Sequence, residues 1–190
     1  MKLGIYGGSF DPVHLGHLLV AQAAMEELEL DRLFFVPAAQ SPFKPEQNSV
    51  PAAVRLQLLR LALAGKTNCE LDDQEILRGG ISYTIETLRD YAQRFPGAQF
   101  FYLIGADNVA KLNEWREAGE LARRAEFVAV PRPGDAAPVF PPPFRGRALR
   151  GFPFAVSSSE IRARIKAGLP VENLVPSAVA ETIWTARLYR

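Results

Sequence analysis

Short, continuously apolar segments alternate along the chain with longer segments whose apolar residues recur every three or four positions. The apolar segments are 3–6, 33–36, 99–104 and 126–130. Each is typical of a strand that is buried on both faces. The segments with helical periodicity are 15–29, 54–64, 83–94 and 107–123. This alternation of strands and helices predicts an α/β fold, a doubly wound parallel sheet with helices on both faces.

A proline-rich segment separates this pattern from the end of the chain. Residues 131–147 contain six prolines, which predicts a long surface loop before the last strand. A domain linker is disfavoured because the 43 residues that follow are too few for an independent core. Two further helices are expected, one capped by Ser158 or Ser159 and one by Ser177. We therefore expect one domain over residues 1–190, with 157–190 as its helical C-terminal portion.

Composition and charge narrow the classes of function. The 190 residues include 22 Lys and Arg against 21 Asp and Glu, a formal net charge of +1. This balance argues against a polybasic nucleic-acid-binding protein. The single cysteine, Cys69, excludes an internal disulfide framework and a cysteine-based zinc site. No apolar run approaches the ~20 residues of a membrane span, and no signal peptide is evident, so we expect a cytoplasmic protein without a membrane partner.

Both histidines of the chain fall in one short segment after the first strand. Gly7 and Gly8 precede them and let the backbone approach a ligand closely. His14 and His17 lie where the first helix begins, and free N–H groups at a helix start attract anions. This combination predicts a site for a phosphate group whose charge grows in a transition state. A catalytic zinc ion needs three protein ligands and only Asp11 lies nearby in sequence, so we expect no protein-bound metal.

A second candidate anion site lies near the end of the chain. Residues 157–159 are three serines, and Arg162 follows them in the first turn of a predicted helix. Hydroxyls at a helix start, followed by an arginine, can bind a polyphosphate. Residues 132–166 also carry seven basic residues against Asp135 and Glu160. The alternative is an ordinary helix cap beside a solvated basic surface.

At this point the motifs resemble a known family. Residues 7–17, Gly-Gly-Ser-Phe-Asp-Pro-Val-His-Leu-Gly-His, resemble the signature of the nucleotidylyltransferase superfamily, whose Rossmann-like domain carries an (H/T)-x-G-H motif. Further blocks in matching order are 41–44, 55–57, 80–84, 86–88, 105–107, Trp115, 132–134 and 154–159. Together they are most similar to the bacterial nicotinate-nucleotide adenylyltransferases. The resemblance implies direct, in-line transfer of an adenylyl group from ATP, with Mg²⁺, to nicotinate mononucleotide, giving deamido-NAD and pyrophosphate.

The resemblance also implies roles for individual residues. His14 and His17 would contact the ATP phosphates and stabilise the transition state. The implied ATP-binding residues are Gly7, Gly8, Ser9, Phe10, Gly16, Gly105, Asp107, Ser157, Ser158 and Arg162. Lys44 would meet the mononucleotide phosphate, while Thr84 and Trp115 would form the nicotinate pocket. The backbone N–H of Arg116 would serve the nicotinate carboxylate.

The chain departs from the family pattern at three places, and two other functions stay open. Phe43 stands where the family commonly has His, Glu86 replaces a common Asp, and Glu160 follows Ser159 where Thr is frequent. One alternative is a phosphopantetheine adenylyltransferase, although Trp115 argues against it. The other is a non-catalytic nucleotide sensor on the same scaffold. The choice between nicotinate and nicotinamide mononucleotide and the oligomeric state, with a homo-oligomer as one option, also stay open.

Overall fold

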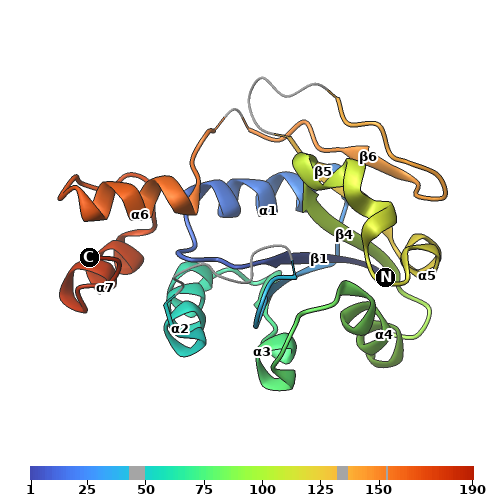
Figure 1. Cartoon of the computed structure of the whole chain (residues 1–190), viewed down its shortest axis with the longest axis horizontal. Coiled ribbons are helices and arrows are strands. Elements are labelled where there is room, and N and C mark those ends of the chain that lie inside the picture. Colours follow the sequence, from blue (N-terminus) through green and yellow to red (C-terminus); the bar gives the residue numbers. More distant parts are fainter. Residues whose placement is uncertain (43–49, 132–136, 153) are drawn as a thin grey trace.

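Six parallel strands form one sheet at the centre of the molecule (Figure 1). The computed structural model describes residues 1–42, 50–131, 137–152 and 154–190. The strands are β1 (Lys2–Gly8), β2 (Arg32–Pro37), β3 (Cys69–Leu71), β4 (Gln99–Gly105), β5 (Glu126–Val130) and β6 (Gly146–Ala148). Their order, β3-β2-β1-β4-β5-β6, is that of a Rossmann fold. It confirms the predicted doubly wound sheet and puts the reversal of strand order between β1 and β4, where ligands of such sheets bind.

Helices cover both faces of this sheet. They are α1 (Leu15–Leu28), α2 (Ala52–Leu63), α3 (Gln74–Arg78), α4 (Thr84–Arg94), the 3₁₀ helix η1 (Ala106–Glu114), α5 (Ala118–Arg124), α6 (Ser158–Lys166) and α7 (Ser177–Thr185). One core packs α1, α2, α6 and α7 against the sheet, and the other packs α4, η1 and α5. Neighbouring residues of β4 alternate between the two cores, as in Phe100 and Phe101. The continuously apolar strands are therefore explained by burial on both faces.

The structure corrects several element boundaries. The predicted helix over 107–123 is two helices, η1 and α5, separated at 115–117, where Glu117 has a left-handed backbone (φ +56°). The predicted loop over 131–147 ends earlier, because β6 begins at Gly146 and pairs with β5. The short elements β3 and α3 were not predicted. Among the described residues, no helix is long and apolar enough to cross a membrane.

The caps of the last two helices also differ from the prediction. Ser157, and not Ser158 or Ser159, caps α6, and its Oγ accepts a hydrogen bond of 3.2 Å from the Glu160 backbone N–H. The residue predicted to cap the last helix, Ser177, is instead the first residue of α7. In Figure 1, α6 and α7 lie together at one end of the molecule, opposite α5. Because Ser157 is the cap of α6, the hydroxyl of Ser158 is available for another contact.

Candidate active site

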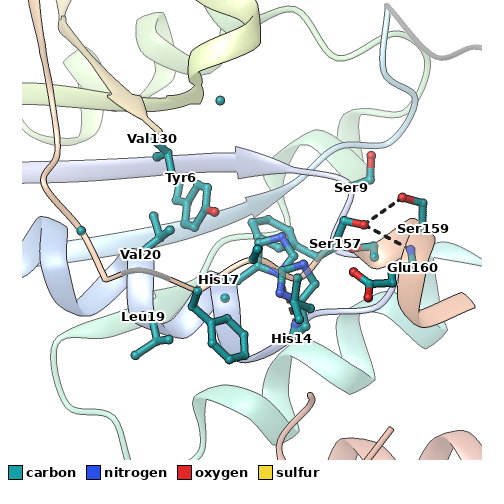
Figure 2. A pocket seen from close by; sticks show the side chains of 18 of the residues that line it. Tyr6, Ser9, His14, His17, Leu19, Val20, Val130, Ser157, Ser159 and Glu160 are labelled. Carbon is teal, nitrogen blue, oxygen red and sulfur yellow. Dashed lines mark hydrogen bonds between the residues drawn. The ribbon is translucent and has the colours of Figure 1, made fainter. Parts of the chain in front are cut away.

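A cavity of about 620 Å³ lies where β1 ends and α1 begins (Figure 2). The segment between these elements forms one wall, the start of α6 forms another, and residues 149, 151, 152 and 154–156 form a third. Nine predicted site residues line it, namely Ser9, Phe10, His14, Gly16, His17, Gly105, Ser157, Ser158 and Arg162. The structure therefore brings together the two anion-binding segments, which are about 145 positions apart in sequence.

The two histidines form a stacked pair at the start of α1. Their ring centroids are 3.7 Å apart, with 26° between the ring planes. The backbone N–H of His14 donates a hydrogen bond of 3.2 Å to Nδ1 of His17. Because Nδ1 of His17 accepts this bond, the neutral ring carries its proton on Nε2. His17 is thus a hydrogen-bond donor at a position fixed by the helix start.

Burial keeps both imidazoles neutral near pH 7. His14 is 5 % exposed, and burial lowers its pKa to about 4. Burial and the neighbouring His14 lower the pKa of His17 well below its usual value. Among the described residues, the buried Nδ1 of His14 has no hydrogen-bond partner. A bound anion would favour the charged form and raise these pKa values, so the pair can take up a proton as a phosphate binds.

The glycines of the signature segment serve two different purposes. Gly16 lies under the His14 ring, where a Cβ atom would be 3.0 Å from Nδ1 of that ring. It therefore makes room for a histidine that faces the cavity. Gly7 and Gly8 lie in β1, outside the cavity lining, and side chains there would meet the Tyr102 hydroxyl and the Phe10 ring. Close packing explains these two glycines, and their contact with ATP stays a prediction.

The start of α6 contacts the signature segment directly. Oγ of Ser158 donates a hydrogen bond of 2.9 Å to the Pro12 carbonyl. Nη1 of Arg162 donates one of 2.6 Å to the Asp11 carbonyl. Arg162 is the one arginine or lysine among the described residues that line this cavity, whereas the acidic side chains there are Asp11 and Glu160. The single guanidinium is therefore the principal fixed positive charge of the described lining.

A second cavity, of about 250 Å³, collects the residues predicted to bind the mononucleotide. Its lining includes Thr84, Trp115 and Arg116. Oγ1 of Thr84 donates a hydrogen bond of 3.3 Å to the Tyr102 hydroxyl, and the Trp115 ring meets that of Tyr102 edge to face, with centroids 6.4 Å apart. The fourth predicted residue, Lys44, lies outside the described residues. The three described residues share one pocket, as the resemblance implied.

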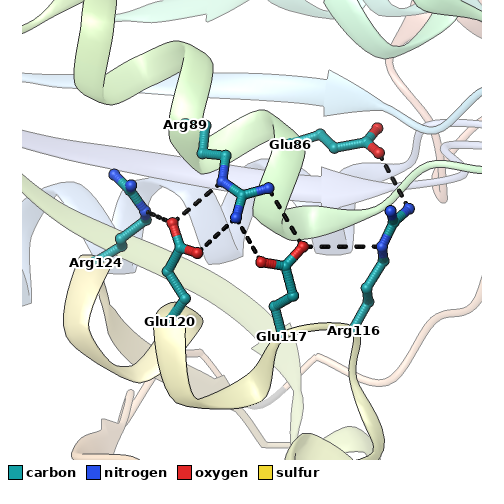
Figure 3. Close-up of polar contacts among 6 residues, drawn as sticks. All are labelled: Glu86, Arg89, Arg116, Glu117, Glu120 and Arg124. Atoms are coloured by element: carbon teal, nitrogen blue, oxygen red, sulfur yellow. Dashed lines mark hydrogen bonds and ion pairs between the residues drawn. The ribbon is translucent and has the colours of Figure 1, made fainter.

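Ion pairs fix the segment that carries the wall of this second cavity (Figure 3). Arg89 of α4 pairs with both Glu117 and Glu120, each at 2.5 Å. Arg116 pairs with Glu86 at 3.3 Å, and its guanidinium lies 4.5 Å from the centroid of the Tyr83 ring. Hydrogen bonds from Arg89 and Arg124 lower the pKa of Glu120 to about 2. The network therefore joins α4 to the start of α5 beside Trp115.

Asp107, predicted to hold the ribose of ATP, lies apart from both cavity linings. Its side chain is exposed, and its Oδ1 accepts a hydrogen bond of 3.3 Å from Nδ2 of Asn108. It follows Gly105, which does line the larger cavity, by two positions. A contact between Asp107 and ATP therefore stays a prediction.

One wall of the larger cavity was missed from the sequence. It is mainly apolar and includes Leu149, Phe152, Phe154 and Val156. Glu27 of α1 holds it, because its two carboxylate oxygens accept hydrogen bonds of 2.9 Å from the backbone N–H groups of residues 150 and 151. No local pattern signals a contact between residues so far apart in sequence. The apolar run at 154–156, directly before the serines, was the available signal.

A Rossmann strand order with histidine and serine–arginine segments facing one cavity defines the class of the nucleotidylyltransferases. In agreement, residues 5–164 match the model of the family described as Cytidylyltransferase-like. Over its whole length the chain is 41% identical to a probable nicotinate-nucleotide adenylyltransferase from Opitutus terrae, covering 98% of that relative. A second such relative, from Exiguobacterium sibiricum, is 39% identical, with 100% and 99% covered. The chain therefore belongs to the nicotinate-nucleotide adenylyltransferase family, which confirms the predicted resemblance.

Solved structures agree on the fold. A Plasmodium falciparum nicotinic acid mononucleotide adenylyltransferase complexed with NaAD superposes with a TM-score of 0.80 over 99% of this chain and 97% of that chain, at 17% identity. A chain of the same enzyme complexed with APC gives a TM-score of 0.77, again at 17% identity, over 99% and 96%. At this identity the similarity establishes the fold alone.

Proposed function

We propose that the protein transfers the adenylyl group of ATP to nicotinate mononucleotide, giving deamido-NAD and pyrophosphate in NAD biosynthesis. The observation that carries this proposal is the meeting of His14, His17 and Arg162 in one cavity. The second cavity, which holds Thr84 and Trp115, supports nicotinate mononucleotide as the acceptor. The whole-length relatives named nicotinate-nucleotide adenylyltransferase support the same reaction.

The reaction needs placement and charge stabilisation more than proton transfer. A phosphate oxygen of the mononucleotide attacks the α-phosphorus of ATP, and the bond from that phosphorus to the oxygen bridging to the β-phosphate breaks. Pyrophosphate leaves with the bonding electrons. Because the attacking phosphate is already an anion, no general base is required. We propose that Nε2–H of His17 and the guanidinium of Arg162 stabilise the charge that develops on the phosphate oxygens, with His14 beside them.

The charges of the cavity support a requirement for a divalent metal with ATP. Its described lining carries one guanidinium against two carboxylates, those of Asp11 and Glu160, whereas ATP carries about four negative charges near neutral pH. Among the described residues, no group of three or more His, Cys, Asp or Glu could hold a metal ion. We propose Mg²⁺, bound mainly by the phosphates themselves, since it retains water and takes few protein ligands.

The remaining residue roles are proposed from the resemblance and the two cavities. The proposed ATP site would be lined by Ser9, Phe10, Gly16, Gly105, Ser157 and Ser158. Contacts of ATP with Gly7, Gly8 and Asp107, which lie outside this lining, are proposed from the resemblance alone. In the second cavity the indole of Trp115 would stack on the pyridine ring, Lys44 would meet the mononucleotide phosphate, and the Arg116 backbone N–H would meet the carboxylate. We further propose a single domain over residues 1–190 and a cytoplasmic location.

The test is pyrophosphate release from Mg-ATP with nicotinate mononucleotide, nicotinamide mononucleotide and phosphopantetheine in parallel, with the product masses. We expect strong release and a deamido-NAD mass with nicotinate mononucleotide. Release with phosphopantetheine instead would retain the cavity of His14 and His17 but overturn the assignment of Thr84 and Trp115. Binding of ATP without release on any acceptor would indicate a nucleotide sensor.

A further inference from the structure

Tyr189, in the segment after α7, reaches the signature segment of the larger cavity. Its hydroxyl donates a hydrogen bond of 2.9 Å to Oδ1 of Asp11, 178 positions away in sequence. Asp11 is 2 % exposed and lines the cavity. Tyr189 also has a left-handed backbone conformation (φ +64°), which is unfavourable for a bulky residue. A strained residue at one end of a partly buried hydrogen bond indicates that this contact is held by the surrounding fold.

The carboxylate of Asp11 faces the arginine assigned to the phosphates. Nη1 of Arg162 donates to the Asp11 carbonyl at 2.6 Å but lies 3.9 Å from the carboxylate oxygen Oδ2. A direct N⁺–H···O⁻ bond would measure about 2.7–2.9 Å. The other oxygen, Oδ1, is held by Tyr189 and, at 3.4 Å, by the Val50 backbone N–H. The carboxylate is thus close to Arg162 without forming a direct hydrogen bond to it.

A second arginine stabilises the same segment without facing the cavity. Arg55 is 4 % exposed, and its Nη1 donates hydrogen bonds of 2.9 Å and 2.8 Å to the carbonyls of Ser9 and Ala38. Nη1 of Arg55 is therefore occupied by backbone carbonyls, whereas its buried Nε has no hydrogen-bond partner among the described residues. Arg162 lines the cavity and Arg55 does not, so Arg162 is the guanidinium for which Asp11 and a phosphate in the cavity would compete.

We propose that Tyr189 is a positioning residue for ATP binding: by holding Oδ1 of Asp11, it keeps that carboxylate from pairing directly with Arg162. This inference rests on the proposed function. Without the hydroxyl, the carboxylate is free to turn toward Arg162 and form a direct ion pair in a poorly hydrated site. The guanidinium would then be less available to the phosphates of ATP. The mononucleotide site, built around Trp115, would not be affected.

The test is Tyr189→Phe, which removes one oxygen atom and keeps the ring. Loss of a hydrogen bond to a charged group corresponds to about a tenfold effect or more, so we expect the Kd for Mg-ATP, measured by calorimetry, to rise about tenfold. The KM for nicotinate mononucleotide should stay within about twofold of that of the unmodified protein. A matched control is Trp184→Phe, which removes the 3.0 Å hydrogen bond from Nε1 of Trp184 to Glu172 in the same region. It should leave ATP binding unchanged.

A double-mutant cycle separates positioning from loss of packing. If Tyr189 acts through Arg162, then Tyr189→Phe should have no further effect on the Kd for ATP in an Arg162→Ala background. A further rise in the Kd for ATP when Tyr189→Phe is added to Arg162→Ala would overturn the inference. So would a Tyr189→Phe variant whose Kd for ATP is unchanged, or one in which binding of both substrates is weakened equally. Melting temperatures would show whether each variant is folded. Because ATP binding is measured without an acceptor, an unmodified protein that forms no deamido-NAD would refute the proposed function and still leave this inference tested.

Discussion

Two substitutions at His17 separate its two hydrogen bonds. Its Nδ1 accepts the 3.2 Å bond from the His14 backbone, whereas its Nε2–H is assigned to the phosphates. In His17→Asn, the amide oxygen can replace Nδ1 as the acceptor, but nothing reaches the position of Nε2. In His17→Gln, the longer side chain carries its amide near Nε2 and leaves the His14 N–H without its partner.

The expected effects follow from what each variant removes. Loss of one preorganised donor to a developing oxyanion costs about 10²–10³-fold in kcat, which is about 3–4 kcal/mol of barrier. We therefore expect His17→Asn to lose that much turnover while keeping its stability. Loss of a hydrogen bond at a helix start costs about 1 kcal/mol. That corresponds to about 2–4 °C in the melting temperature of a chain of this size, and we expect it for His17→Gln.

The assay is the initial rate of pyrophosphate release at saturating Mg-ATP and nicotinate mononucleotide, together with a thermal melt of each variant. His17→Ala removes both interactions and should combine the low turnover with the lower melting temperature. Near-normal turnover of a folded His17→Asn variant would refute the role assigned to Nε2–H. An Asn variant that is as unstable as the Ala variant would refute the separation of the two hydrogen bonds.

Three further predictions concern acid stability and the two cavities. Burial lowers the pKa of His14 to about 4, so the unfolded chain binds a proton at this residue before the folded protein does as the pH falls. The free energy of unfolding should therefore drop by about 3 kcal/mol between pH 6.5 and 4. A free energy from urea titrations that stays constant across that range would contradict this. Glu27→Ala removes the acceptor of the backbone N–H at residue 151. In steady-state assays it should raise the KM for ATP several-fold with kcat retained, whereas the control Glu26→Ala should leave the KM for ATP unchanged. Trp115→Ala should raise the KM for nicotinate mononucleotide at least tenfold and leave that for ATP unchanged.

The strands that could be predicted from the sequence are those in the centre of the sheet. β2, β1, β4 and β5 each have neighbours on both sides and apolar residues facing both cores, so continuous apolar runs marked them within about two residues at each end. The two edge strands are less well marked in the sequence: β3 was not predicted, and β6 was expected only as a last strand after the proline-rich loop, without bounds. Each has three residues and one neighbouring strand, and none of these residues is buried. A hydrophobic pattern is a weak guide to a strand of three residues, none of which is fully buried.

In the candidate site, too, residues whose role depends on local sequence were predicted, and residues whose role depends on distant contacts were not. His14, His17 and the segment 157–162 were predicted because their chemistry is contained in short stretches that begin helices. Glu27, which holds the apolar wall at residues 150 and 151, and Tyr189, which contacts Asp11, have partners 123 and 178 positions away. Such contacts depend on the packing of α1, α6 and α7 around one end of the sheet. Neither residue type nor spacing along the chain indicates them.

The histidine pair limits how much positive charge the protein itself can offer to ATP. Two rings stacked 3.7 Å apart repel each other when both are protonated, so phosphate binding favours uptake of one proton by the pair. Even with one proton on the pair, the described lining with Arg162 would supply about two positive charges against the roughly four negative charges of ATP, and the carboxylates of Asp11 and Glu160 lie in the same lining. In the proposed reaction, the protein would therefore stabilise the transition state mainly with N–H donors at the starts of α1 and α6. A divalent cation that arrives with ATP would supply the remaining charge, so that a cavity with few charges of its own could still bind a polyphosphate.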